Sequence, residues 1–355
     1  MSTRDKFSQA QRVIKQGQAA FRQKLAVEDK ADAARLKVAY NRMLTKLDKR
    51  LADLRSIAAE DGMTSRKFIQ EAAVVRLRDD MQHELDALSK VIERAALRAE
   101  QAGATAAQQI AELSLRAAGV EGAFNQPSIE SLRALAGFVD NPAFKVNIEQ
   151  FAGYHANQVS DLILIGASKG QNPRITARAV TRYVDTFPLV DANRTVRTVR
   201  IWSARQGTLD IFRANADVVQ SWTWSASIGD LRTCASCVMM HGTVHDLSET
   251  LDDHHSGRCA PIPNTPTWAE LGFSGGRDLP NVQTGIAWFE AQDDATQRSI
   301  LGNAAWRAWK DGAYELDQIP TQYQDSVYGP MRRAASLTEL VGRDTARAYI
   351  YGKAA

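Results

Sequence analysis

One stretch of the chain, residues 222–263, gathers most of the side chains that can bind a soft metal ion. It contains all three cysteines of the protein and four of its six histidines. Cys234 and Cys237 are separated by two residues, a spacing that lets one tight turn direct both sulfurs at a single point. Cys259 follows on a later segment, which must fold back on this turn to bring a third sulfur to it. We call this stretch the knuckle.

A histidine supplies the remaining ligand in this metal-site hypothesis, and two neighbours, His254 and His255, are available before Cys259. Thiolates and imidazole suit zinc, and four ligands would close its coordination sphere without leaving a position for water. Such an ion would stabilise a small module that has little apolar surface of its own. The alternative is that the cysteines stay reduced and only pack, with Arg258 and the histidines hydrogen-bonded nearby.

Two short strands are predicted below this loop. Alternation around Trp222 and Trp224, and again through Thr243 and Val244, favours a β-hairpin. The knuckle is therefore expected to be a β-hairpin that carries a Cys/His site.

The same residues resemble the Mu F-like minor head (phage head morphogenesis) family, best from about residue 172 to 263. The likeness consists of a tryptophan-bearing strand, an Asp-x-Arg-Thr-Cys-x-x-Cys turn from Asp230, a glycine strand and a closing His-x-x-x-Arg-Cys. In that register His254 takes the position of the family histidine, and Gly257 stands where the family usually has another cysteine. The resemblance thus favours His254 over His255 as ligand. The predicted zinc ligands are Cys234, Cys237, His254 and Cys259.

What the resemblance implies is a structural protein and not an enzyme. It implies a few copies in a tailed-phage head, near the portal, with portal protein and major capsid or scaffold proteins as partners. The expected location is the interior of the virion head, and the host cytoplasm during assembly.

The distribution of charge adds one further candidate partner. Residues 1–50 contain thirteen Lys and Arg against five Asp and Glu, whereas the formal charge of the whole chain is only +3. This basic segment could contact DNA or an acidic protein surface, or simply form a solvated helix face. The chain has no run of eighteen apolar residues and no apolar signal sequence at its start, so no membrane partner is expected.

Long helices are predicted for the first third of the chain. One apolar stripe, at spacings of three and four, lies within residues 21–59, and a second follows Gly62 and ends near Gly103. Joined by a short turn, they predict an antiparallel helical hairpin. The stripes are Tyr40, Met43, Leu47, Leu51, Leu54 and Ala58, and then Phe68, Ala72, Val75, Met81, Leu85, Leu88 and Ile92.

Further helices are expected in the middle of the chain and after the knuckle, with Pro188 beginning the helix that leads into the knuckle. The fold class is therefore mainly α with a small β component (α+β): a long helical hairpin, a helical middle, the knuckle and a helical tail. The predicted domains are residues 1–120, a long-helix interaction region; 121–265, the head-morphogenesis domain; and 266–355, the tail.

Two other functions were weighed against a structural role. Asp253-His254-His255 after a Cys-x-x-Cys pair is superficially similar to a metal-dependent nuclease of the His-Asn-His type. That chemistry needs a histidine base and a further metal ligand from a later helix, but His255 is the last histidine of the chain. A phage-borne toxin is the other alternative, and the residues after 263 contain neither histidine nor cysteine.

Overall fold

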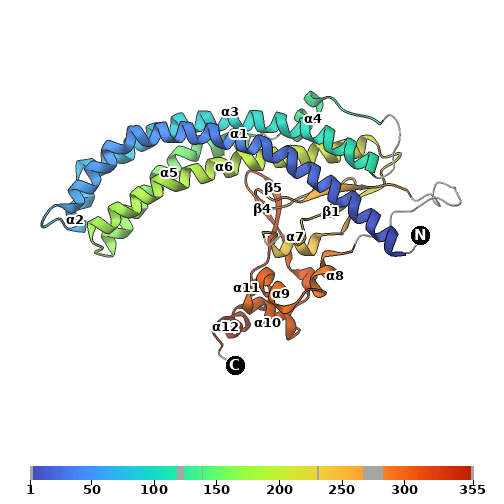
Figure 1. Cartoon of the computed structure of the whole chain (residues 1–355). Helices are drawn as coiled ribbons and strands as arrows, with labels where there is room; N and C mark the ends of the chain where they lie inside the picture. Colours follow the sequence, from blue (N-terminus) through green and yellow to red (C-terminus); the bar gives the residue numbers. More distant parts are fainter. Residues whose placement is uncertain (1–2, 118–123, 138, 230–231, 267–282, 353–355) are drawn as a thin grey trace. The chain divides into compact units, whose positions relative to one another are not determined.

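The computed structural model shows a mainly helical protein, with 70% of its residues in helices, and with small antiparallel sheets in the C-terminal third (Figure 1). The predicted fold class, with its long N-terminal helices, small β component and helical tail, is confirmed. The structure describes residues 3–117, 124–137, 139–229, 232–266 and 283–352.

Long helices account for most of the chain up to the knuckle. They are α1 (Thr3–Ala59), α3 (Ala72–Ala117), α5 (Pro142–Ser168) and α6 (Pro173–Ala214), with the short α2 (Ser65–Gln70) and α4 (Ile129–Ala136) between them.

The chain forms two compact units, and α1, α3 and α6 each contribute residues to both. The helical unit comprises residues 26–102 and 137–200, and the knuckle unit comprises residues 1–25, 103–136 and 201–355. Because the long helices pass from one unit to the other, each unit is built from segments distant in sequence. The domain boundaries expected at residues 120 and 265 stay predictions.

In the helical unit, α1 and α3 pack as the antiparallel hairpin expected from their apolar stripes. Two ion pairs, Lys46–Glu84 and Arg50–Asp80, join the helices. The residue number rises along α1 from one pair to the next and falls along α3, as antiparallel packing requires. Every residue of the first predicted stripe, from Tyr40 to Ala58, is buried.

The second stripe is correct at Phe68 and from Met81 onward but wrong between them, where Ala72 and Val75 are exposed. The reason is a break at Glu71, which ends α2 in an extended conformation. The buried face of α3 therefore does not continue the three- and four-residue spacing counted from Phe68. The residues that α3 buries before Met81 are Ala73 and Leu77.

Two predicted helix boundaries are wrong. The second long helix does not end near Gly103, because α3 continues to Ala117. A glycine costs a helix about 1 kcal/mol relative to alanine. That cost is small beside the packing of buried Ala104 and Ala107, which lie in the core of the knuckle unit.

Pro188 does not begin a helix either, since it lies inside α6. Proline has no N–H, and it therefore leaves the carbonyl oxygen four residues earlier, that of Val184, without its helical donor. The hydroxyl of Tyr40 on α1 donates a hydrogen bond to that oxygen. A side chain from another helix thus satisfies the acceptor that the proline releases, and α6 continues.

The knuckle unit is organised on a three-stranded antiparallel sheet with the order β2-β1-β3. Its strands are β1 (Ser221–Ser225), β2 (Val244–Asp246) and β3 (Ala260–Asn264). Trp222 pairs with His245 on β2 and with Pro263 on β3. The predicted pairing of the tryptophan strand with the segment at Val244 is confirmed, but β3 was not predicted.

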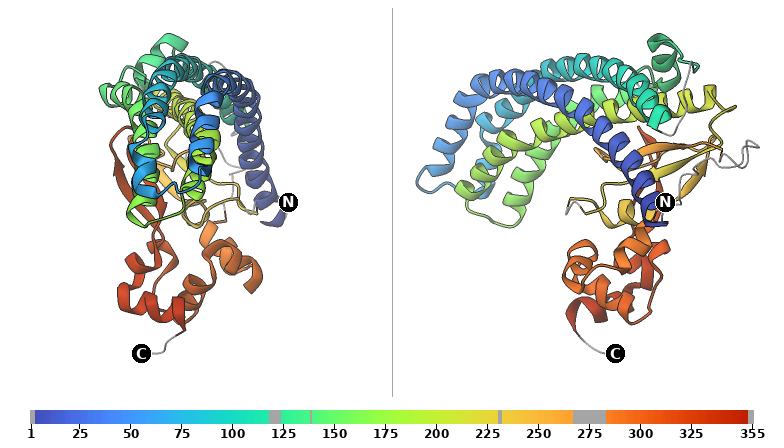
Figure 2. Two further views of the ribbon diagram at one scale, coloured as in Figure 1. Left: turned by 90° about the vertical axis from the view of Figure 1, so that its left-hand side faces the viewer. Right: turned by 45° about the vertical axis from the view of Figure 1, so that its right-hand side comes forward.

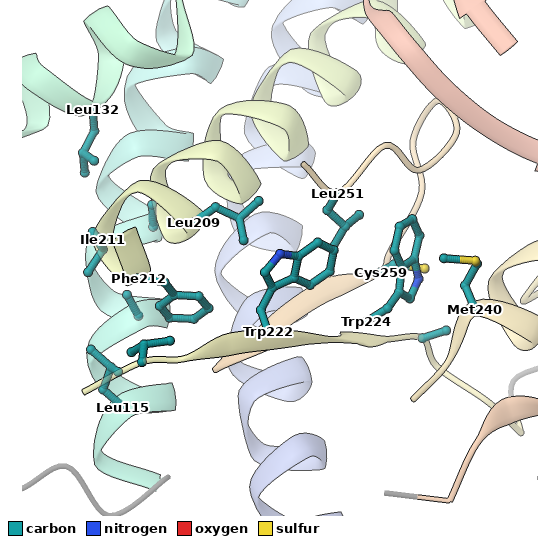
Figure 3. Packing of buried hydrophobic residues seen from close by; sticks show 14 of the residues in the cluster. Leu115, Leu132, Leu209, Ile211, Phe212, Trp222, Trp224, Met240, Leu251 and Cys259 are labelled. Atoms are coloured by element: carbon teal, nitrogen blue, oxygen red, sulfur yellow. The ribbon is translucent and has the colours of Figure 1, made fainter. Parts of the chain in front are cut away.

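Two tryptophans two residues apart on β1 point to the same side of the sheet, as strand geometry requires. Trp222 and Trp224 are almost completely buried, and they meet α6 residues such as Leu209 and Phe212 in one apolar core (Figure 3). Cys237 and Cys259 belong to this same core. Two of the three cysteines are therefore part of this core, and Cys234 packs against it.

The C-terminal part is helical, as expected, but it also contains a hairpin that the sequence analysis missed. Strands β4 (Pro320–Asp325) and β5 (Gly329–Ala334) pair antiparallel. The surrounding helices form one small group (Figure 2) with a shared core that includes Phe289, Trp288 and Trp309. These helices are α8 (Gly285–Glu290), α9 (Asp294–Leu301), α10 (Asn303–Lys310), the 3-10 helix η1 (Leu316–Gln318), α11 (Leu337–Val341) and α12 (Arg343–Tyr351).

Candidate metal centre

A short helix, α7 (Ala235–Met240), positions the two sulfurs of the Cys-x-x-Cys pair. Cys234 is its N-cap residue in extended conformation, and its Sγ accepts a hydrogen bond from the backbone N–H of Cys237. The N-cap and third helical positions lie over the same end of a helix. The two sulfurs consequently lie 3.3 Å apart.

The loop between β2 and β3 brings the histidine to these sulfurs. The Nε2 atom of His254 lies 3.4 Å from the Sγ of Cys234 and 3.4 Å from the Sγ of Cys237. The Nδ1 atom of His254 lies 2.9 Å from the backbone oxygen of His255, which fixes the ring. Three of the four predicted ligands thus form one group whose ligand atoms all lie within 4.8 Å of one another.

The fourth predicted ligand lies on the other side of Cys237. Cys259 forms a second group of the same size with Cys237 and Asp253, and all three residues of that group are buried. The two groups share Cys237. The cluster of Cys234, Cys237, His254 and Cys259 could bind a metal ion.

His255 lies apart from the sulfurs. Its Nε2 atom is 3.4 Å from the carboxylate of Asp325 on β4, and its ring meets the ring of Tyr328 edge-on at 4.7 Å. Three residues earlier on the same loop, Asp252 accepts two hydrogen bonds of 3.1 Å from Arg332 on β5. The unpredicted β4–β5 hairpin therefore holds this loop on both sides of His254.

The sequence analysis missed the role of Asp253 and Arg205. The carboxylate of Asp253 is buried beside Cys237, and Arg205 on α6 donates to it at 2.7 Å. Arg205 also donates to the backbone oxygen of Cys259 at 2.9 Å. An aspartate next to the candidate histidine was visible in the sequence, whereas nothing in the sequence connected Arg205 on α6 to the loop.

Hydrogen bonds within the cluster shift the pKa values of Cys234 and His254 in opposite directions. Hydrogen bonds with Cys237 and His254 lower the pKa of the Cys234 thiol, although burial opposes this shift. The hydrogen bond with Cys234, helped by the charge of Asp253, raises the pKa of His254 against the effect of burial. The two shifts are opposite in sign, and each favours the charged form of its group.

The remaining buried groups of the cluster titrate differently. Hydrogen bonds with Cys234 and Cys259, together with burial, raise the pKa of Cys237. Burial also raises the pKa of Cys259. Burial opposes ionisation of Asp253 as well, but the charges of Arg205 and His254 outweigh it, and the pKa of Asp253 lies below its ordinary value.

The other two histidines of the knuckle have structural surroundings. His245 stacks on Trp222 with ring centroids 4.4 Å apart and contacts Glu249 at 3.0 Å. His241 is buried, accepts a hydrogen bond from the backbone of Ala226, and has its pKa lowered by burial to about 4.

Comparisons with protein families, with curated proteins and with solved structures found no match for this chain. The resemblance of residues 172–263 to the Mu F-like family therefore stays a prediction from the sequence. None of the helices in the described part of the chain is both long and apolar enough to cross a bilayer.

Proposed function

We propose that the chain is a minor structural protein of a tailed-phage head, acting in head morphogenesis through protein contacts. The observation that carries this proposal is the assembly of the knuckle motif. Its tryptophan strand is the central strand of one sheet, and Cys234, Cys237 and His254 meet at the start of the helix that follows. The residues of the motif, which are spread over the sequence, thus lie together in one three-dimensional unit.

Zinc is the ion that we propose for this unit, as a structural ion. Thiolate and imidazole ligands suit zinc better than magnesium or calcium, which prefer oxygen. The surroundings favour a structural role over a catalytic one, because Cys237, Cys259 and Asp253 are buried and both nitrogens of His254 are already engaged. A nuclease of the His-Asn-His type would need a histidine available as general base.

Portal protein is the first partner that we propose, with major capsid or scaffold proteins as further ones. Exposed charged side chains such as Lys37, Arg42 and Asp48 occur along α1, and such a surface suits contacts along a neighbouring protein. DNA is a secondary candidate through the basic residues 1–50, of which the side chains of residues 1–15 lie outside the described residues.

Co-expression with the portal protein of the same phage tests this function. We expect the full-length chain to co-purify with the portal in the absence of other head proteins, and to do so at both low and physiological salt. An unrelated portal protein serves as the matched control. Recovery with neither the cognate portal nor the cognate capsid and scaffold proteins, together with metal-dependent cleavage of DNA, would favour the nuclease alternative.

A further inference from the structure

The carboxylate of Asp253 lies at ligand spacing from two of the three residues in the group of Cys234, Cys237 and His254. Its Oδ1 atom is 3.3 Å from the Sγ of Cys237 and 3.5 Å from the Nε2 of His254. The other three separations among Cys234, Cys237 and His254 are 3.3, 3.4 and 3.4 Å. Around a tetrahedral zinc ion, donor atoms lie roughly 3.3–3.8 Å apart. The separations of Oδ1 of Asp253 from Cys237 and from His254 match that spacing.

The first oxygen of Asp253, Oδ1, accepts from the backbone N–H of His254 at 2.8 Å and lies next to the Sγ of Cys237, and the second oxygen is held by two other donors. Oδ2 accepts from the guanidinium of Arg205 at 2.7 Å and from the backbone N–H of Cys259 at 3.4 Å. The side chains of Arg205 and Asp253 are only 4% and 2% exposed. A buried carboxylate with one oxygen held in this way is preorganised to offer the other oxygen to a cation.

Gly257 leaves the space that this carboxylate occupies. A Cβ atom at residue 257 would lie 2.0 Å from Oδ2 of Asp253 and 2.5 Å from its Cγ. No residue with a side chain fits at position 257 while Asp253 keeps this orientation. The loop is thus built around the carboxylate.

Cys259 shares the apolar core with Cys237, and it is grouped with Cys237 and Asp253 but not with Cys234 or His254. It packs in the cluster that contains Trp224, Met240 and Leu251 (Figure 3). Its main chain contacts both partners of the buried ion pair, since its N–H donates to Asp253 and its carbonyl accepts from Arg205. Cys259 is therefore placed to position Asp253 through the backbone.

The charges of the buried groups favour the same assignment. Two thiolates, one carboxylate, a divalent ion and the Arg205 guanidinium sum to zero. With Cys259 as a third thiolate ligand and Asp253 outside the coordination sphere, the same buried groups would keep one uncompensated negative charge. An uncompensated buried charge is costly.

We propose that Asp253 is the fourth ligand of the metal ion, with Cys234, Cys237 and His254, and that Cys259 is a positioning residue and not a ligand. This inference rests on the zinc site proposed above. It assigns the knuckle two sulfur ligands, where the cysteine count alone suggests three.

X-ray absorption at the zinc edge of the full-length protein, purified without chelator or affinity metal, tests the assignment. Zinc–sulfur bonds of about 2.3 Å are distinct from zinc–nitrogen or zinc–oxygen bonds of about 2.0–2.2 Å, so the spectrum counts the sulfur ligands. We expect one zinc per chain with two sulfurs. Three sulfurs would overturn the assignment but leave the zinc site intact, whereas a zinc content near zero would overturn both.

Two variants test whether Asp253 or Cys259 is a ligand of the metal ion. Cys259→Ser should keep one zinc and two sulfurs, and a fall to fewer sulfurs would show that Cys259 is a ligand. Asp253→Cys should raise the count from two sulfurs to three, because a thiolate then occupies the ligand position. A zinc-loaded Asp253→Cys protein that still shows two sulfurs would overturn the role of Asp253. If that variant does not fold, the wild-type and Cys259→Ser spectra decide.

Discussion

The sulfur of Cys234 combines two local roles, because it caps α7 and contacts the imidazole of His254. It is also the most accessible sulfur of the cluster, since Cys237 and Cys259 are buried. A substitution at Cys234 therefore tests the metal site with less damage to the apolar core than one at Cys237.

Cys234→Ser should remove bound zinc and destabilise the knuckle unit. Serine keeps an oxygen that can cap the helix, so the loss should come from the metal. At free zinc about a hundredfold above the Kd, binding stabilises the folded state by about 2.7 kcal/mol. Chemical denaturation with added zinc should show a loss of this order, and with excess chelator the variant and the wild type should converge. Equal stability of the two proteins in zinc would contradict a structural ion.

His155 in the helical unit makes stability depend on pH. Its side chain is 1% exposed, its Nδ1 lies 2.7 Å from the hydroxyl of Tyr183, and burial lowers its pKa from 6.5 to about 4, against the opposing charge of Asp191. Below pH 6.5 the unfolded chain binds a proton that the folded protein does not. Stability should therefore fall as the pH drops from 6.5 to 4, by roughly 3 kcal/mol in all.

His155→Gln should flatten this part of the pH profile. The exposed His83 on α3 gives the control, because His83→Gln should leave the profile of the wild type unchanged. Denaturation at several pH values from 4 to 7 measures both variants. A profile that is equally steep with and without His155 would mean that other groups carry the acid sensitivity.

At the scale of elements, helix α6 depends on a hydrogen bond from another helix. Tyr40 on α1 donates to the carbonyl of Val184, the acceptor that Pro188 leaves without an amide. Tyr40→Phe should cost about 1 kcal/mol. In a Pro188→Ala background the restored amide can donate to Val184, so the same change should cost less. A double-mutant cycle by urea denaturation measures the coupling, and identical costs in the two backgrounds would refute the compensation.

One arginine of the β4–β5 hairpin should contribute measurably to the stability of the knuckle. Arg332 makes two hydrogen bonds to Asp252, which is buried beside the candidate ligands. Arg332→Ala should lower the free energy of unfolding by about 2 kcal/mol, as expected for hydrogen bonds to a charged group. Its neighbour Arg333 pairs with an exposed Glu339, so Arg333→Ala should change stability little. Equal effects of the two substitutions would exclude a specific clamp on the loop.

Elements with a strong apolar period were predictable, and those that depend on distant partners were not. The stripe from Tyr40 to Ala58 fixes α1, and the alternation at Trp222 fixes β1, because each pattern is local. Pro188 is a helix breaker by local rules, and only the hydroxyl of Tyr40 makes it tolerable. Strand β3 was missed because two prolines argue against a strand, yet β3 lies at an edge of the sheet, where prolines are accepted.

The candidate site shows the same division. Cys234, Cys237 and the histidine follow from spacing, because a short turn and a short loop bring them together. The ion pair of Arg205 and Asp253 joins residues 48 positions apart, and no periodicity predicts such a contact.

For the molecule as a whole, we propose the role of an assembly component. Long helices provide extended surfaces for contact, and the knuckle provides a small unit that a metal ion would stabilise. Neither feature requires turnover of a substrate. Under the proposed function, the protein is expected in the particle itself from the first stages of head assembly.

Quantitative mass spectrometry of purified proheads and mature virions from the encoding phage tests this claim most directly. We predict peptides from the whole chain in both particles, at a few copies per particle, in constant ratio to the portal protein through successive purification steps. Absence from both particles, in a lysate where the protein is abundant, would contradict the structural role.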